Sequence, residues 1–345
     1  IDVIGVQPSA FAEEVQDYLA DLDELMPEAA GEDWKELYSE KCLEQGNQLT
    51  GGDTKMLVLT NSGSMVGFYN AALLKEIGCE VPKTFEEYKA VAEAFKAKYP
   101  DKYVSVFAGK DAWVVDEMML TVLGQQGDYY NKWRYEEAPV DSPEYKQAID
   151  GLKKYFDEGI FSPDVLDLDY ASATEEFTNG NALIYYMGSW EAPLLSNKLR
   201  EGNGIELENV GAMALPVAEE GGQLTVRSYI DSGIGVVDYS EKKEAAAKFV
   251  AYLTVGEGAD IFGKQLTGTS AKKDFTVDET LFDTEESKAG WDTVNELINT
   301  ATADRNNVSG YSDVEGAAVQ SVLNGSATTE DVLKDLQKEW TSGKY

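Results

Sequence analysis

Short uncharged runs, rich in β-branched and aromatic residues, alternate along the chain with longer segments in which apolar residues recur every three or four positions. The short runs predict buried strands and the periodic segments predict amphipathic helices, because these spacings match the periods of the two structures. Strands are expected at 1–6, 56–59, 66–70, 103–107, 182–187, 211–215 and 233–237. Helices between short buried strands favour an α/β fold with mostly parallel sheets.

Several of the expected helices carry clear start or stop signals. Thr84 and Glu87 form a capping-box pattern, Pro143 stands at a first helical position, and Gly78 and Gly159 follow helix ends. Helices are expected at 11–25 (one or two), 34–43, 71–77, 84–99, 113–123, 142–156, 241–253, 291–300, 311–323 and 328–340.

A polar link, Asn61–Ser64, separates the second expected strand from the third. This composition is typical of a chain that crosses between two lobes, and a plain loop is equally compatible with it.

The stretch from Phe177 to Glu191 combines the features from which a ligand site can be expected. Phe177 closes a segment of helical character, a turn follows, and 182–187 is an uncharged strand. Gly188 and Ser189 end the strand, and Trp190 and Glu191 come directly after it. Open α/β sheets bind ligands at the carboxyl ends of their strands, although Trp190 could equally be a core residue just past a strand.

Composition narrows the possible partners. The 345 residues suit two domains, and no run of apolar residues is long enough to cross a membrane. Sixty-three acidic residues against 29 basic ones give a net charge of −34. Such a surface repels nucleic acid and anionic lipid, whereas it would attract a polyamine or a metal ion. The acids are scattered along the chain, which favours a solvated surface.

Residue types that are absent or rare exclude whole classes of chemistry. The chain has no histidine, so Ser-His and Cys-His nucleophiles and histidine-ligated zinc are excluded. The two cysteines, Cys42 and Cys79, have no metal-site spacing; buried free thiols are expected, with a Cys42–Cys79 disulfide as the alternative. No cofactor or bound metal is expected.

Four groups of residues, in a fixed order along the chain, carry a resemblance to a known family. They are Gly67–Asn70 with Ala72, Leu73, Gly78 and Val81–Tyr88; Phe177, Gly180, Ala182 and Gly188–Trp190; Val210, Gly211, Leu215, Pro216, Gly233 and Glu244–Val250; and Gly325 with Glu330–Trp340. Together they resemble the extracellular solute-binding proteins of bacterial ABC importers, in the group related to maltose-binding protein, over nearly the whole chain.

The resemblance implies a two-lobe α/β fold of the periplasmic-binding-protein type II class, with a ligand cleft between the lobes. The N-lobe would comprise 1–62 and 233–283, the C-lobe 66–230 and 286–345, and the hinges would lie near 61–66, 229–233 and 283–286. Family members begin with a strand, a helix and a second strand upstream of the segment that Ile1–Ile4 resembles. We therefore expect an upstream segment, preceded by a signal peptide or a lipoprotein cysteine.

By the same resemblance, a set of polar and aromatic residues should face the cleft. Trp113, Trp190 and Tyr311 would stack on sugar rings, and the ionised acids would accept hydrogen bonds from hydroxyl groups. The complete expected set is Gln7, Ser9, Asn61, Ser62, Ser64, Asp111, Trp113, Trp190, Glu191, Tyr229, Asp231 and Tyr311.

The function that follows is a monomeric, non-enzymatic sugar-binding protein of the bacterial exterior that delivers a sugar to a membrane permease. Two other functions stay open: a binding protein for a polyamine or another non-sugar solute, and a glycoside hydrolase with two catalytic carboxylates. An acid-lined cleft without aromatic platforms would favour the polyamine, and turnover of an oligosaccharide would favour the hydrolase.

Overall fold

In the computed structural model of the protein, residues 1–301, 308 and 310–345 are described, and the chain divides into two compact units. Unit 1 contains Ile1–Ser62 and Tyr229–Glu279; unit 2 contains Gly63–Ser228, 280–301 and Gly310–Tyr345. The lobe and hinge limits given by the resemblance stay a prediction.

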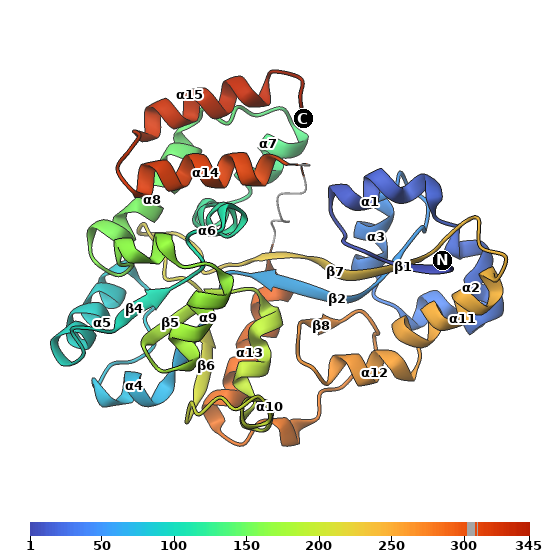
Figure 1. The fold of residues 1–345 in the computed structure, drawn as a ribbon, viewed down its shortest axis with the longest axis horizontal. Coiled ribbons are helices and arrows are strands. Elements are labelled where there is room, and N and C mark those ends of the chain that lie inside the picture. Colours follow the sequence, from blue (N-terminus) through green and yellow to red (C-terminus); the bar gives the residue numbers. More distant parts are fainter. Residues whose placement is uncertain (302–307, 309) are drawn as a thin grey trace. The chain divides into compact units, whose positions relative to one another are not determined.

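Unit 1 is built on a four-stranded sheet with the order β1-β7-β2-β8 (Figure 1). These strands are β1 (Val3–Val6), β7 (Arg227–Val236), β2 (Leu57–Ser64) and β8 (Thr269–Ser270). Its helices are α1 (Ala10–Val15), α2 (Leu22–Ala30), α3 (Glu40–Leu49), α11 (Lys243–Thr254) and α12 (Glu257–Gly263), with 3₁₀ turns at Gln16–Tyr18 and Trp34–Leu37. Tyr38 ties this core to β2, because its buried hydroxyl donates to the carbonyl of Val58 and accepts from the amide of the same residue.

Unit 2 contains a second four-stranded sheet with the order β4-β5-β3-β6. Its strands are β4 (Tyr103–Val106), β5 (Ala182–Met187), β3 (Val66–Asn70) and β6 (Val210–Met213). The helices are α4 (Ala71–Glu76), α5 (Phe85–Lys98), α6 (Ala112–Gly124), α7 (Tyr129–Tyr135), α8 (Pro143–Asp157), α9 (Tyr170–Thr178), α10 (Asn197–Gly202), α13 (Glu285–Thr300), α14 (Tyr311–Leu323) and α15 (Thr329–Trp340). Further 3₁₀ turns lie at Pro163–Asp167, Ser189–Leu195 and Glu279–Leu281.

The expectation of mostly parallel sheets is wrong. β4 and β5 run parallel, but β1–β7, β2–β8, β3–β5 and β3–β6 are antiparallel. The order of helices and strands along the chain does not fix which strands become neighbours. β3, for example, lies between β5 and β6, two strands that come more than a hundred residues later in the sequence.

The polar segment Asn61–Ser64 is the end of strand β2, and the chain passes from unit 1 to unit 2 within it, between Ser62 and Gly63. The change of direction is made by Met65, whose φ of 61° is in the left-handed region, and β3 begins at the next residue. Polar residues are compatible with this strand because their backbone groups still pair: Asn61, for example, lies opposite Thr269 in β8.

Helix boundaries follow the capping signals where these are strong. The reciprocal capping box of Thr84 and Glu87 opens α5, and Pro143 opens α8. Gly78 and Gly159, with φ of 70° and 72°, follow α4 and α8. The expected helix at 34–43 is instead a 3₁₀ turn followed by α3, and α7, α10 and α12 were not expected because each is short. Among the described residues, no helix is both long and apolar enough to cross a membrane.

Candidate ligand-binding site

Four of the expected residues come together in unit 2, at one edge of its sheet. β4 and β5 are adjacent and parallel, so the segments that follow their carboxyl ends lie at the same edge. Asp111 and Trp113 come after β4, at the start of α6, and Trp190 and Glu191 come after β5 in the 3₁₀ turn Ser189–Leu195. The Trp113 and Trp190 rings are 6.4 Å apart between centroids and tilted by 39°.

Trp190 owes its position to the glycine two residues before it. A Cβ atom built on Gly188 would lie 2.2 Å from the indole ring, so the ring lies directly against the Gly188 backbone. Ser189 fixes the same turn from the other side, because its hydroxyl accepts a hydrogen bond of 3.0 Å from the amide of Gly63. The Gly-Ser-Trp sequence at 188–190 thus holds the Trp190 indole against the backbone just after β5.

Tyr170 is a member of this group that the sequence analysis missed. It is the first residue of α9; its hydroxyl donates to the Glu191 carboxylate, and its backbone amide donates to Asp111 at 2.9 Å. The ring is 37% exposed, so part of it remains at the surface. The signal that could have found it is Asp169, an N-cap residue that marks the start of a helix just before an aromatic side chain.

We call Asp111, Trp113, Tyr170, Trp190 and Glu191 the aromatic–carboxylate cluster. Tyr170 is partly exposed and the other four members are half-buried, so the cluster reaches the surface of unit 2. Burial raises the pKa of Glu191, and the hydrogen bond from Tyr170 opposes that shift. Burial and the Glu191 charge raise the pKa of Tyr170, so its hydroxyl remains a donor.

Three expected residues form a smaller polar group in unit 1. The Gln7 side-chain amide donates to Asp231 at 3.1 Å, and Asp231 also accepts from the amide of Ser232 at 2.7 Å. Ser9 caps α1 by accepting from the amide of Phe11. Gln7 is exposed, whereas Ser9 and Asp231 are half-buried, so this group also lies at a surface.

The other expected residues are buried. Asn61, Ser62 and Ser64 lie inside along β2, with exposures of 5%, 1% and 0%, and Tyr229 on β7 is 1% exposed. The Ser64 hydroxyl is committed to a hydrogen bond of 2.7 Å to Glu117.

Tyr311, expected to stack on a sugar, is fully buried at the start of α14. It packs in an aromatic cluster with Trp133, Trp340 and Tyr345. In this structure its ring therefore serves packing within unit 2. The sequence could not distinguish the two roles, because a tyrosine at a helix start is common to both.

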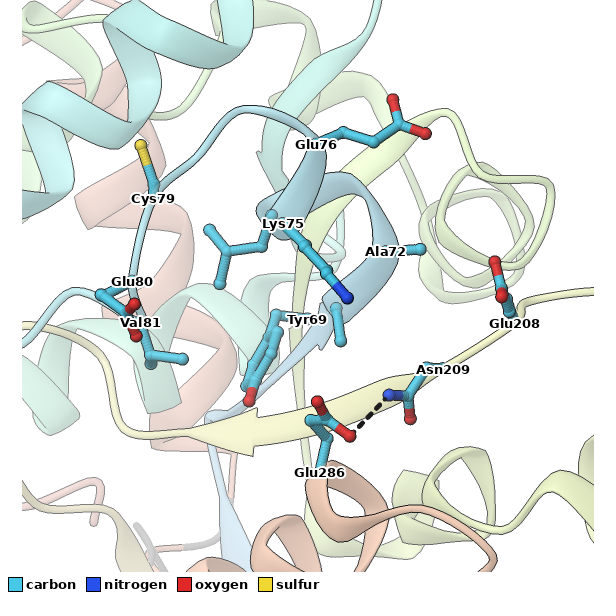
Figure 2. Close-up of a pocket in the computed structure, with 12 residues that line it drawn as sticks. Tyr69, Ala72, Lys75, Glu76, Cys79, Glu80, Val81, Glu208, Asn209 and Glu286 are labelled. Atoms are coloured by element: carbon cyan, nitrogen blue, oxygen red, sulfur yellow. Dashed lines mark hydrogen bonds between the residues drawn. The ribbon is translucent and has the colours of Figure 1, made fainter.

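A hollow of about 580 Å³ lies elsewhere in unit 2, lined by Tyr69, Lys75 and Cys79 together with four glutamates (Figure 2). Two of these carboxylates already have protein partners: Glu286 accepts from Asn209 at 3.0 Å, and Glu76 accepts from Lys98 at 3.0 Å. None of the expected site residues lines it. Cys79 is half-buried rather than buried as expected; it and the buried Cys42 are both free thiols.

The described residues contain no group of three or more acidic or thiol side chains placed to hold a metal ion. What the aromatic–carboxylate cluster offers instead is two indole faces, a phenol and two carboxylates within one surface. Rings of this kind cover apolar C–H faces, and carboxylates accept hydrogen bonds from hydroxyl groups.

Comparison with solved structures defines the fold first. The chain superposes on maltose-bound MalE3 of T. maritima with a TM-score of 0.77 at 20% identity, covering 99% of this chain and 84% of that one. A chitin oligosaccharide binding protein gives a TM-score of 0.77 at 19% identity, covering 98% and 82%. The fold is therefore the two-domain, maltose-binding-protein-like α/β fold of the solute-binding proteins.

The family follows from the sequence. The family model described as "Bacterial extracellular solute-binding protein" matches residues 2–260, and the chain belongs to that family.

Two curated relatives are similar in sequence. A multiple sugar-binding protein of Streptococcus mutans is 24% identical over 194 residues, which is 54% of this chain and 44% of that protein. A maltotriose-binding protein of Pyrococcus abyssi is 29% identical over 185 residues, or 52% and 36%. The match thus spans less than half the length of these relatives.

Proposed function

We propose that this protein binds a sugar, most suitably an oligosaccharide, and delivers it to the permease of a bacterial ABC importer. The observation that carries the proposal is the aromatic–carboxylate cluster, in which Trp113, Trp190 and Tyr170 stand beside Asp111 and Glu191. The similarity to a multiple sugar-binding protein and to a maltotriose-binding protein supports it.

In this proposal the sugar stacks on Trp190 and Trp113. Its hydroxyl groups donate to Glu191 and Asp111, and bonds to these ionised acceptors contribute more than bonds between neutral groups. The polar group of unit 1, Gln7 with Asp231, supplies a second set of hydrogen bonds from across the cleft that the family resemblance implies. The protein acts outside the cell as a monomer, held to the membrane by a lipid anchor, and carries out no catalysis.

Because each unit would supply part of the contacts to the sugar, the proposal implies that ligand binding closes the two units around it. If a sugar contacts one set of residues in each unit, it binds best when both sets reach it at once, and binding therefore increases the population of the closed arrangement. The permease then recognises that closed arrangement.

The test is thermal melting of the purified protein with maltotriose, raffinose, xylo-oligosaccharides, chito-oligosaccharides, monosaccharides and spermidine, followed by calorimetry on any compound that raises the melting temperature. A ligand at one hundred times its Kd stabilises the protein by about 2.7 kcal/mol, which raises the melting temperature by several degrees. A shift with one class of oligosaccharide, with no product formed on standing, supports the proposal. A shift with spermidine alone would contradict the proposal that the ligand is a sugar. Formation of a product would contradict the proposal that the protein only binds its ligand.

A further inference from the structure

Helix α6 carries a second pair of acids, one turn beyond the aromatic–carboxylate cluster, and this pair is inside the protein. Asp116 and Glu117 are 0% and 2% exposed, and they lie near Glu315 of α14 and Arg227 of β7, which are 0% and 1% exposed. We call these four residues the buried charge cluster. All four belong to unit 2.

Glu117 contacts two different strands. Its Oε2 atom accepts a hydrogen bond of 2.7 Å from the Ser64 hydroxyl and lies 3.3 Å from Nε of Arg227. The Arg227 guanidinium is also held from another side, because it lies 4.2 Å from the centre of the Tyr130 ring. A single carboxylate on α6 thereby fixes the last residue of β2 and the first residue of β7.

These two strand ends have a special place in the chain. β2 and β7 are neighbours in the sheet of unit 1, and each also connects unit 1 covalently to unit 2 (Figure 1). The limits of unit 1 are Ser62 on β2 and Tyr229 on β7. Ser64 and Arg227 are each two residues from those limits, on the unit 2 side. On these two strands, a rearrangement of the units requires backbone rotation between the anchors and unit 1; the chain also passes from unit 1 to unit 2 between Glu279 and Thr280.

The other two members of the buried charge cluster, Asp116 and Glu315, lie where α6 and α14 pack together. α14 crosses α6 at very close approach, because a Cβ atom on Gly316 would lie 1.8 Å from the carbonyl oxygen of Ala112. This brings Glu315 to Asp116, and burial together with the Glu315 charge raises the pKa of Asp116 well above its ordinary value. The raised pKa favours the neutral form of Asp116 beside Glu117.

We propose that Glu117 is a positioning residue that anchors both connecting strands to α6, so that the two units move relative to one another only between defined arrangements. Without the anchor, the ends of β2 and β7 would lose their shared attachment to unit 2, and the range of arrangements would widen. The link to ligand affinity rests on the proposed function; the anchoring itself does not, because it concerns the ligand-free protein.

The test measures the distance between the units in the ligand-free protein by pulsed electron paramagnetic resonance. Spin labels are placed at Glu93→Cys on α5 and Lys248→Cys on α11, both exposed, in a Cys79→Ser background. We expect the distance distribution of Glu117→Leu, which removes both the acceptor for Ser64 and the charge beside Arg227, to be about twofold broader than that of the parent protein, because the strand anchors are released. Ser64→Ala, which removes one of the two contacts, should broaden it less.

A second variant separates anchoring from stability. Glu117→Leu removes the carboxylate beside the buried Arg227, so Glu117→Leu/Arg227→Leu, which removes both charges and both hydrogen-bonding groups, should melt at a higher temperature than the single variant and still show the broad distribution. Leu152→Ala, a cavity in the core of the same unit, is the matched control and should lower the melting temperature without broadening.

A distribution in the double variant as narrow as in the parent protein overturns the proposal, and so does equal broadening in Leu152→Ala. Failure of maltotriose and the other sugars to bind the parent protein overturns the proposed function but leaves the anchoring result intact. If sugars bind, the double variant should bind several-fold more weakly than Leu152→Ala at a temperature where both are folded.

Discussion

The aromatic–carboxylate cluster and the buried charge cluster use the same residue types on the same helix with opposite results. Asp111 and Trp113 at the start of α6 are half-buried, whereas Asp116 and Glu117 on its next turn are fully enclosed. At the surface, carboxylates and aromatic rings keep free faces that a ligand can use. Inside, the Glu117 carboxylate contacts Ser64 and Arg227, and it becomes a structural anchor. Exposure, rather than residue type, therefore separates a binding group from a structural one.

The largest effect is expected from Glu117→Gln. Removing the charge of one partner of a buried ion pair should lower the free energy of unfolding by about 3–5 kcal/mol. Chemical denaturation with fluorescence detection measures this loss. The surface pair of Lys89 and Glu158, at 2.6 Å, gives the control, since Glu158→Gln should cost less than about 1 kcal/mol. Equal losses in both variants would remove the distinction between the two environments.

Trp190→Ala should give the next largest effect, on binding instead of stability. Loss of a central aromatic contact typically costs about 2–4 kcal/mol, which weakens the affinity by roughly 30-fold or more. Calorimetry with the sugar found in the melting panel measures it. Tyr239→Ala removes a ring that is 69% exposed in unit 1 and should leave the affinity unchanged.

Glu191→Gln tests the charge of the half-buried Glu191 in the aromatic–carboxylate cluster. Loss of a hydrogen bond to an ionised acceptor costs about 1.5–3 kcal/mol, so the affinity at neutral pH should fall by roughly 10-fold or more. Because burial raises the pKa of Glu191, the parent protein should itself lose affinity as the pH falls through that raised pKa, since the carboxylate takes up a proton.

The pH profile supplies the contrast for this prediction. Calorimetry between pH 4 and 8 should show an affinity that changes with pH in the parent protein and in Glu175→Gln, an exposed position on α9, but that is flat in Glu191→Gln. A parallel decline in all three proteins would exclude Glu191 as the titrating group.

Asp116→Asn should give the smallest effect, and only at higher pH. The folded-state pKa of Asp116 is raised, so its contribution to stability is complete below the ordinary carboxyl pKa and is lost as the pH rises through the raised value. An amide cannot ionise, so the fall in melting temperature as the pH rises above the ordinary carboxyl pKa should be smaller for Asp116→Asn than for the parent protein. An identical fall would show that Asp116 does not carry a proton in the native state.

Local signals predicted much of this fold. The capping box at Thr84, the proline at the start of α8 and the glycines after α4 and α8 are decided by groups a few residues apart, and the structure confirms them. Strand pairing was not predicted correctly, because it depends on contacts between distant segments. The path of β2 through Ser64 was missed for the same reason: its polar residues resemble a loop until the partner strand is known.

The candidate site divides in the same way. Trp190 and Glu191 could be recognised because the strand before them and the Gly-Ser turn are continuous in sequence. Tyr170 could not, since its link to Glu191 joins α9 to a segment beyond β5. Likewise, the enclosure of Ser64 and Tyr311 could not be predicted, because burial is set by helices α6, α7 and α15, which pack around them.

The contact between the Trp190 ring and Gly188 has a consequence for anyone who redesigns this protein as a sensor. Any side chain at position 188 would displace the Trp190 indole, so positions 188 and 190 must be kept together or changed together. A combinatorial library aimed at new ligands should therefore hold 188–190 constant and diversify Trp113 and Tyr170. Those two positions lie on separate helices and can change without rebuilding the turn.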